Sequence, residues 1–205
     1  RAVGQASSSD PVVITTKTLP YPPNPPSFLA LDTATSSSMG LSFLPPSIDA
    51  THGTATGYRV EYSSNGGVSW SQTSWSSPSG TVYGLAGNQE YRFRVLAFNA
   101  GGNSAFSSIE TGTTLSLPPQ NTTTGDVTDS QITLAWSAPA QVNAPANYRI
   151  DVSNLSEGWG WGSLETVGGN VFSRTLSLRA NTSWAIRVVA IGSAGAGESS
   201  SVTAK

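Results

Sequence analysis

Four tryptophans stand in two short stretches rich in Gly and Ser, where an indole is unusual as a pure core residue. Trp70 and Trp75 lie in VSWSQTSWSS, and Trp159 and Trp161 lie in EGWGWG. An indole face can stack on the apolar C–H face of a pyranose, so carbohydrate contact is one interpretation. The other is that an indole in each stretch folds over its own sheet or packs against a neighbouring domain. Because the feature occurs twice, we expect an inter-domain or inter-chain contact to be its functional form.

Catalytic chemistry has little support in the sequence. His52 is the only histidine and lies in DATHGTATG, a stretch typical of a solvated loop. The chain has no cysteine, which excludes thiolate nucleophiles, disulfides and cysteine metal sites. Asp126 and Asp129 in GDVTDS supply too few oxygen ligands for calcium and fit a polar turn better. We therefore expect no catalytic residues, no metal site and no cofactor.

Two acidic residues lie within stretches that alternate apolar and polar side chains. Glu61 in YRVEY and Asp151 in YRIDV fall on the polar side of that alternation. Glycoside hydrolysis needs two facing carboxylates, one of them buried, and these two are predicted to lie on outer faces. We expect them to pair with Arg94 and Arg187 on the adjacent strand, as surface ion pairs worth about 0–1 kcal/mol.

The composition restricts the class of partner. Charged residues make up 11% of the chain and the net charge is −2, against roughly a quarter charged in an average globular domain. With no basic surface, we expect no nucleic-acid partner. No apolar run is long enough to span a membrane, so no span is expected in this segment. The low charge and the abundance of Ser and Thr suit an extracellular or cell-surface location.

An internal repeat sets the organisation of the chain. LSFLPP aligns with LAWSAP so that Phe43 matches Trp136, and YRFRVLAFNAGG aligns with WAIRVVAIGSAG so that Tyr91 matches Trp184. Both pairs are separated by 93 residues. Each copy consists of short stretches with a period of two, which predicts antiparallel strands with one buried face. The fold class is therefore all-β, with two sandwiches in tandem.

These motifs, in this order and twice, resemble the fibronectin type III family. YPPNPPS and LPPQN resemble its proline-rich linker, LAWSAP its second strand, and GYRVEYS and NYRIDVS its third. Leu85 precedes Tyr91 by six residues, as in the tyrosine corner of the family's sixth strand. Trp184 takes the tyrosine's place in the second copy and lacks the phenol hydroxyl. The resemblance covers nearly the whole chain and implies two immunoglobulin-like β-sandwiches.

The first twenty residues belong to neither copy. GQASSSDPVVITTKTLP resembles GGNSAFSSIETGTTLSLP, the last strand of the first copy with the adjoining linker. We expect residues 1–20 to be the last strand and linker of a preceding fibronectin type III domain, with further domains at 21–116 and 117–205. On this interpretation the chain is a segment of a longer tandem array. The alternative is an ordinary Ser- and Thr-rich extension.

The first tryptophan stretch comes after a predicted hairpin turn. Asn65-Gly66 favours a type I′ turn, because both positions need a positive φ. The run Ser63, Asn65, Gly67, Ser69 and Trp70 also resembles the Asp-box hairpin of sialidases, with Asn in place of Asp, and that motif is generally structural. The W-S-x-W-S box of cytokine receptors is excluded, since it belongs after the sixth strand.

Three sequons permit N-glycosylation, at Asn121, Asn154 and Asn181. All three fall at expected loops or strand ends of the second copy. Asn154 is the strongest candidate because it lies in a hairpin loop.

Two functions remain open. The first is a non-catalytic structural or adhesive segment, in which proline-stiffened linkers make a semi-rigid rod or surface fibre. Its partners would be neighbouring fibronectin type III domains or other chains of the same protein. The second is a recognition module, in a receptor ectodomain or beside a carbohydrate-active enzyme, whose tryptophan hairpins contact glycans. An intracellular array ranks last, because of the low charge and high Ser and Thr content.

Overall fold

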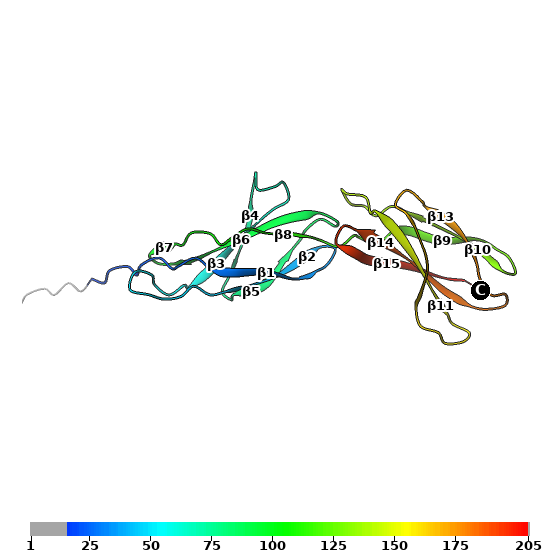
Figure 1. Ribbon diagram of the computed structural model, residues 1–205, viewed down its shortest axis with the longest axis horizontal. Helices are drawn as coiled ribbons and strands as arrows, with labels where there is room; N and C mark the ends of the chain where they lie inside the picture. Colours follow the sequence, from blue (N-terminus) through cyan, green and yellow to red (C-terminus); the bar gives the residue numbers. More distant parts are fainter. Residues whose placement is uncertain (1–15, 205) are drawn as a thin grey trace, which may run out of the picture.

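Residues 16–204, which the computed structural model describes, contain strands and no helix. The strands of the first sandwich are β1 (Ser27–Ala34), β2 (Ser38–Leu44), β3 (Gly57–Ser63), β4 (Ser71–Trp75), β5 (Ser79–Tyr83), β6 (Glu90–Asn99), β7 (Gly102–Asn103) and β8 (Glu110–Thr113). Those of the second are β9 (Gln120–Val127), β10 (Gln131–Ser137), β11 (Asn147–Asn154), β12 (Gly162–Gly168), β13 (Ser173–Ser177), β14 (Trp184–Gly192) and β15 (Gly195–Ala204). Figure 1 shows the two sandwiches end to end along the long axis.

Both sandwiches have the same topology, with antiparallel pairing throughout. In the first, the sheet β1-β2-β5 faces a sheet of order β4-β3-β6, and β7 and β8 both pair with β6. In the second, β9-β10-β13 faces β12-β11-β14-β15. The prediction of two tandem all-β sandwiches is confirmed.

The predicted inward rows form the two cores. On β6 the side chains of Tyr91, Phe93, Val95 and Ala97 are all buried, and their equivalents on β14 are buried in the same way. Full burial of each large apolar side chain contributes about 1.5–3 kcal/mol. The partner sheets supply matching aromatic pairs: Phe43 meets Tyr58 edge-on at 4.9 Å between ring centroids, and Trp136 meets Tyr148 at 5.6 Å.

The corner at the start of the sixth strand differs between the copies. In the first, the backbone N–H of Ala86 donates to the Tyr91 hydroxyl at 2.9 Å. In the second, the indole Nε1 of Trp184 is buried and has no hydrogen-bond partner among the described residues. The corner hydrogen bond is therefore formed in the first sandwich and is missing in the second.

The strand expected within residues 1–20 lies mostly in residues 1–15, outside the described part, and residues 16–20 form no strand. The next two residues, Tyr21 and Pro22, are tied to the loops at the outer end of the first sandwich. The Asn99 side chain donates to the Tyr21 carbonyl at 2.7 Å, and the Gly53 N–H donates to the Pro22 carbonyl at 3.2 Å.

Two Tyr→Phe substitutions, one in each sandwich, should have different effects on stability. Tyr91→Phe removes an accepted hydrogen bond and should lower the free energy of unfolding of the first sandwich by about 1 kcal/mol. Tyr148→Phe removes a buried hydroxyl that has no partner and whose pKa is raised by burial. It should leave the second sandwich equally stable or more stable. Urea unfolding monitored through NMR signals of each domain measures both; equal losses would contradict the assignment.

Candidate functional site

The hairpin between β3 and β4 holds Trp70 over the outer face of its sheet. Asn65 Oδ1 accepts the hydroxyl of Ser63 at 2.8 Å and the backbone N–H of Ser69 at 3.0 Å. Ser63 Oγ in turn accepts the N–H of Gly67 at 2.9 Å. Gly67 has a φ of 93°, and a Cβ there would lie 3.3 Å from the Trp70 ring. The Asp-box-like run is therefore a structural unit that aims the indole.

Trp70 and Phe106 hold an arginine between them. The guanidinium carbon of Arg94 lies 4.0 Å from the Trp70 ring centroid and 3.9 Å from that of Phe106, well within the range of cation–π attraction. Arg94 donates through Nε and Nη2 to Glu61 Oε2, at 2.9 and 2.7 Å. The stack covers the carboxylate, so that Glu61 is only 8% exposed.

The second sandwich repeats this arrangement with different residues. Arg187 lies 4.6 Å from the Trp161 ring centroid and donates to Asp151 Oδ2 at 3.0 Å. Arg149 donates to the other carboxylate oxygen at 2.8 Å. Asp151 is 2% exposed. Each copy therefore has a buried acid, an arginine on the sixth strand and a tryptophan above it.

The predicted partners of Glu61 and Asp151 are correct, but the prediction that these are exposed surface pairs is wrong. The alternation placed the acids on the outer face, and the indoles then cover that face. Burial by itself would raise the pKa of Asp151. The hydrogen bonds from Arg149 and Arg187 outweigh burial and hold the pKa below its ordinary value of 3.8.

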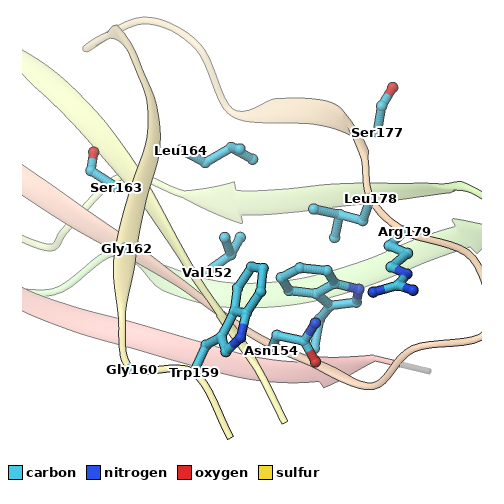
Figure 2. A pocket seen from close by; sticks show the side chains of 11 residues that line it. Val152, Asn154, Trp159, Gly160, Gly162, Ser163, Leu164, Ser177, Leu178 and Arg179 are labelled. Atoms are coloured by element: carbon cyan, nitrogen blue, oxygen red, sulfur yellow. The ribbon is translucent and has the colours of Figure 1, made fainter. Parts of the chain in front are cut away.

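The other two tryptophans have different surroundings. Trp75 stacks on Phe43 with an interplanar angle of 6° and packs against the first core. Trp159 is 60% exposed and forms one wall of a cavity of about 390 Å³ (Figure 2). Of the four candidate contacts, Trp70, Trp75 and Trp161 pack on their own domain, and Trp159 is the most exposed.

The cavity opens on the flank of the second sandwich, between β12 and β13. Its apolar lining includes Val152, Leu164 and Leu178, and Trp184 lies among them. In Figure 2 the Val152 side chain lies above Trp159, Leu178 and Arg179 lie to the right, and Asn154 lies beside Trp159 at the bottom of the site. Arg179 is paired with Glu157.

A difference between the copies at one position of the third strand contributes to this opening. Val152 pairs with Ile186 and Gly162, and at the same register of the first sandwich Tyr62 pairs with Phe93 and Ser71. The Tyr62 ring packs against Tyr91, the counterpart of Trp184, at 6.4 Å between centroids. Valine leaves the corresponding volume unfilled.

The joint between the sandwiches is built on Asn88, which sequence analysis missed. Its Nδ2 donates to the carbonyls of Asn143 and Ala144 at 3.1 and 3.0 Å, and its Oδ1 accepts the Ser193 N–H at 3.2 Å. In return, Asn143 Nδ2 donates to the Asn88 carbonyl at 2.9 Å. Asn88 is 6% exposed and has a φ of 49°, a left-handed conformation that Asn tolerates better than most residues.

The linker is fastened by the same loops. Ser116 is fully buried, and its carbonyl accepts the Glu198 N–H at 3.3 Å. Glu198 Oε1 also accepts the hydroxyl of Ser36 from the first sandwich at 2.5 Å. A Cβ at Gly197 would lie 2.2 Å from the Ser116 carbonyl oxygen, so the close approach requires glycine. Side chains of both sandwiches and the linker therefore share one contact zone.

The three sequons differ in accessibility. Asn121 and Asn181 are exposed, with φ values of 51° and 53°. Asn154, the strongest candidate on sequence grounds, is 1% exposed, and its Oδ1 accepts the N–H groups of Ser156 and Glu157 at 3.0 and 3.1 Å. A glycan on Asn154 would require that turn to open, so the structure favours the other two positions.

The polar loops form small local networks. His52 Nδ1 lies 2.9 Å from Asp49, and hydrogen bonds from the Thr51 backbone, then from Asn24 and other side chains, lower the pKa of Asp49. Among residues 16–204 there is no cluster of three or more His, Cys, Asp or Glu suited to a metal ion. In that same part of the chain no helix is long and apolar enough to cross a membrane.

The topology, the corner of the first sandwich and the repeated strands define a tandem pair of immunoglobulin-like β-sandwiches. The chain belongs to the fibronectin type III family: the family's domain profile matches residues 24–113 and 117–205. Fibronectin type III domains are typically non-catalytic. A two-domain fibronectin type III segment of chicken tenascin shares the fold, with a TM-score of 0.52 and 20% identity over 88% of this chain and 98% of that one.

Longer proteins contain similar segments. The mouse cell adhesion molecule DSCAML1 is 28% identical over 98% of this chain, and chicken receptor-type tyrosine-protein phosphatase S is 30% identical over 76%. Rat contactin-3 is 27% identical over 85% of the chain. The chain spans about a tenth of the length of the first two, and the phosphatase match lies in its fibronectin type III region, outside its catalytic domains.

The buried acid of the second sandwich predicts a pH dependence. Asp151→Asn should lower the free energy of unfolding of that sandwich by about 1.5–3 kcal/mol near neutral pH, because charge-assisted hydrogen bonds are lost. Since the folded pKa of Asp151 is lowered, its contribution is present above the ordinary value of 3.8 and disappears as pH falls through the folded pKa.

Denaturant unfolding of the second sandwich at a series of pH values measures this difference. Glu165→Gln is the matched control, because its pair with Arg174 is exposed, and it should change stability little. A difference for Asp151→Asn that does not decrease as the pH falls below 3.8 would contradict the role assigned to the carboxylate.

Proposed function

We propose that this chain is a non-catalytic structural and adhesive segment of an extracellular fibronectin type III array. The observation that carries the proposal is the Asn88 joint, in which one side chain is hydrogen-bonded to three residues across the domain boundary. With the linker fastened at Ser116, the joint favours one relative orientation. Two sandwiches held in this way act as a semi-rigid rod that spaces and presents neighbouring domains.

The relatives support the adhesive context. One is a cell adhesion molecule and another is a receptor-type phosphatase, and tandem fibronectin type III domains in such proteins contact neighbouring domains or other chains. For this chain we propose an extracellular or cell-surface location, domain boundaries at 21–116 and 117–205, and partners of the same domain type. Side-by-side contacts between such rods would assemble them into surface fibres.

Loss of the joint hydrogen bonds should free the two sandwiches from each other. Asn88→Ala removes all of them, and it also strains a left-handed backbone position. Residual dipolar couplings should then require separate alignment tensors for the two sandwiches, where the unmodified chain requires one.

Asn181→Ala is the matched control, since Asn181 has the same left-handed backbone and is exposed. It should leave the common alignment unchanged. Independent tumbling of the two sandwiches in the unmodified chain would contradict the rod.

The open cavity favours a second candidate, recognition of a glycan on the flank of the second sandwich. Trp159 presents an exposed indole beside a pocket of about 390 Å³, which suits the apolar face of a pyranose. Ser163 and Ser177 also line it and offer hydroxyl groups to the sugar. The indoles of Trp70 and Trp161 are engaged with arginines and are less suited to this role.

Filling the cavity tests this candidate. Val152→Tyr introduces the residue that the first sandwich has at this position. It should abolish binding of any glycan that a glycan-microarray screen identifies as a ligand of the unmodified chain. Trp159→Ala should weaken binding about two- to twelvefold, since stacking contributes about 0.5–1.5 kcal/mol. Trp161→Ala, outside the cavity lining, is the control and should retain binding. Equal binding by all variants would exclude the flank as the glycan site.

A further inference from the structure

The exposed end of the second sandwich carries a residue equivalent to the one that forms the joint. Asn181 comes three residues after Leu178, as Asn88 comes three residues after Leu85, and the two asparagines are 93 residues apart. Both leucines lie in or against their cores. The backbone φ is 49° at Asn88 and 53° at Asn181. The same residue type, register and left-handed conformation therefore recur at the far end of each sandwich.

Asn88 shows what such an asparagine recognises. Its amide meets two backbone carbonyls in the loop between β10 and β11 and one backbone N–H in the turn between β14 and β15. Main-chain groups supply these contacts, so this part of the recognition depends on loop geometry, and the Asn143 side chain adds a hydrogen bond to the Asn88 carbonyl. Asn181 is exposed and has the same left-handed backbone as Asn88, so a similar pair of loops can reach its amide.

The two positions differ in the residues on their C-terminal side. Gln89 and Glu90 come after Asn88, whereas Thr182 and Ser183 come after Asn181 and complete a sequon. A glycan on asparagine is attached to Nδ2, which at Asn88 is the atom that donates to both carbonyls. Attachment replaces one of its two hydrogens with a bulky sugar. Joint formation and glycosylation therefore exclude each other.

We propose that Asn181 is a docking residue for the loop end of another fibronectin type III sandwich, and that N-glycosylation of Asn181 prevents this docking. The proposal rests on the rod function above. In the modification, Nδ2 attacks the anomeric carbon of a lipid-diphosphate-linked oligosaccharide. A C–N bond forms, the anomeric C–O bond to the diphosphate breaks, Nδ2 loses one proton, and the lipid diphosphate leaves. When Asn181 is unmodified, the rod continues into another sandwich. When Asn181 is glycosylated, the rod ends at this sandwich.

The test uses the full chain extended by a second copy of residues 114–205, so that Asn181 faces the same loops and linker as Asn88. Made without glycosylation, this protein should align as one body in residual dipolar coupling measurements. Asn181→Ala should cause loss of common alignment for the added sandwich alone. Asn88→Ala should cause the same loss at the first joint.

Made in a secretory host, the extended chain should carry a glycan at Asn181 by peptide mapping and should lose alignment of the added sandwich. Ser183→Ala removes the sequon and keeps Asn181, so it should restore alignment in that host. An aligned third sandwich in Asn181→Ala, an aligned glycosylated form, or an unoccupied Asn181 would each overturn the proposal. If Asn88→Ala also has no effect, the rod function fails as well; a response at Asn88 alone overturns only this inference.

Discussion

The packing of one sheet against the other in each sandwich is the interaction on which everything else depends. The chain has no cysteine, so no disulfide can hold the sheets together, and burial of the inward rows must do so. Phe93 and Ile186, at the same position of the two copies, are completely buried. Because β6 and β14 are fixed by these inward residues, their outward arginines are fixed too. The tryptophan stacks and the inter-sandwich joint are built on strands that this burial holds in place.

Much of this could be predicted from alternation and from the repeat. The inward row of β6, from Tyr91 to Ala97, results directly from its period of two. The burial of Glu61 and Asp151 could not be predicted in this way, because alternation indicates which face a side chain lies on and not what covers that face. The indole that covers Glu61 comes from a hairpin whose conformation depends on hydrogen bonds of Asn65 and Ser63. These contacts are local in space but are not periodic in sequence.

Neither the joint nor the cavity was predicted from the sequence, and the reasons differ. Asn88 meets backbone groups of two loops, and every residue type carries such groups, so no sequence pattern marks its partners. The cavity had a visible signal: YRVEY aligned with YRIDV places Tyr62 opposite Val152. That loss of ring volume can be recognised only once the strands are known to occupy the same register.

The position of the cavity on a flank has a geometric consequence. Contacts between the sandwiches are made at their ends. Asn88 at the end of the first sandwich meets the loop of Ser193 at the facing end of the second. The opening beside Trp159 faces sideways and uses none of these groups. A molecule seated there would therefore leave the Asn88 joint intact. Because Tyr62 fills the equivalent position of the first sandwich, this lateral contact would be displayed by the second sandwich alone, once in each pair of domains.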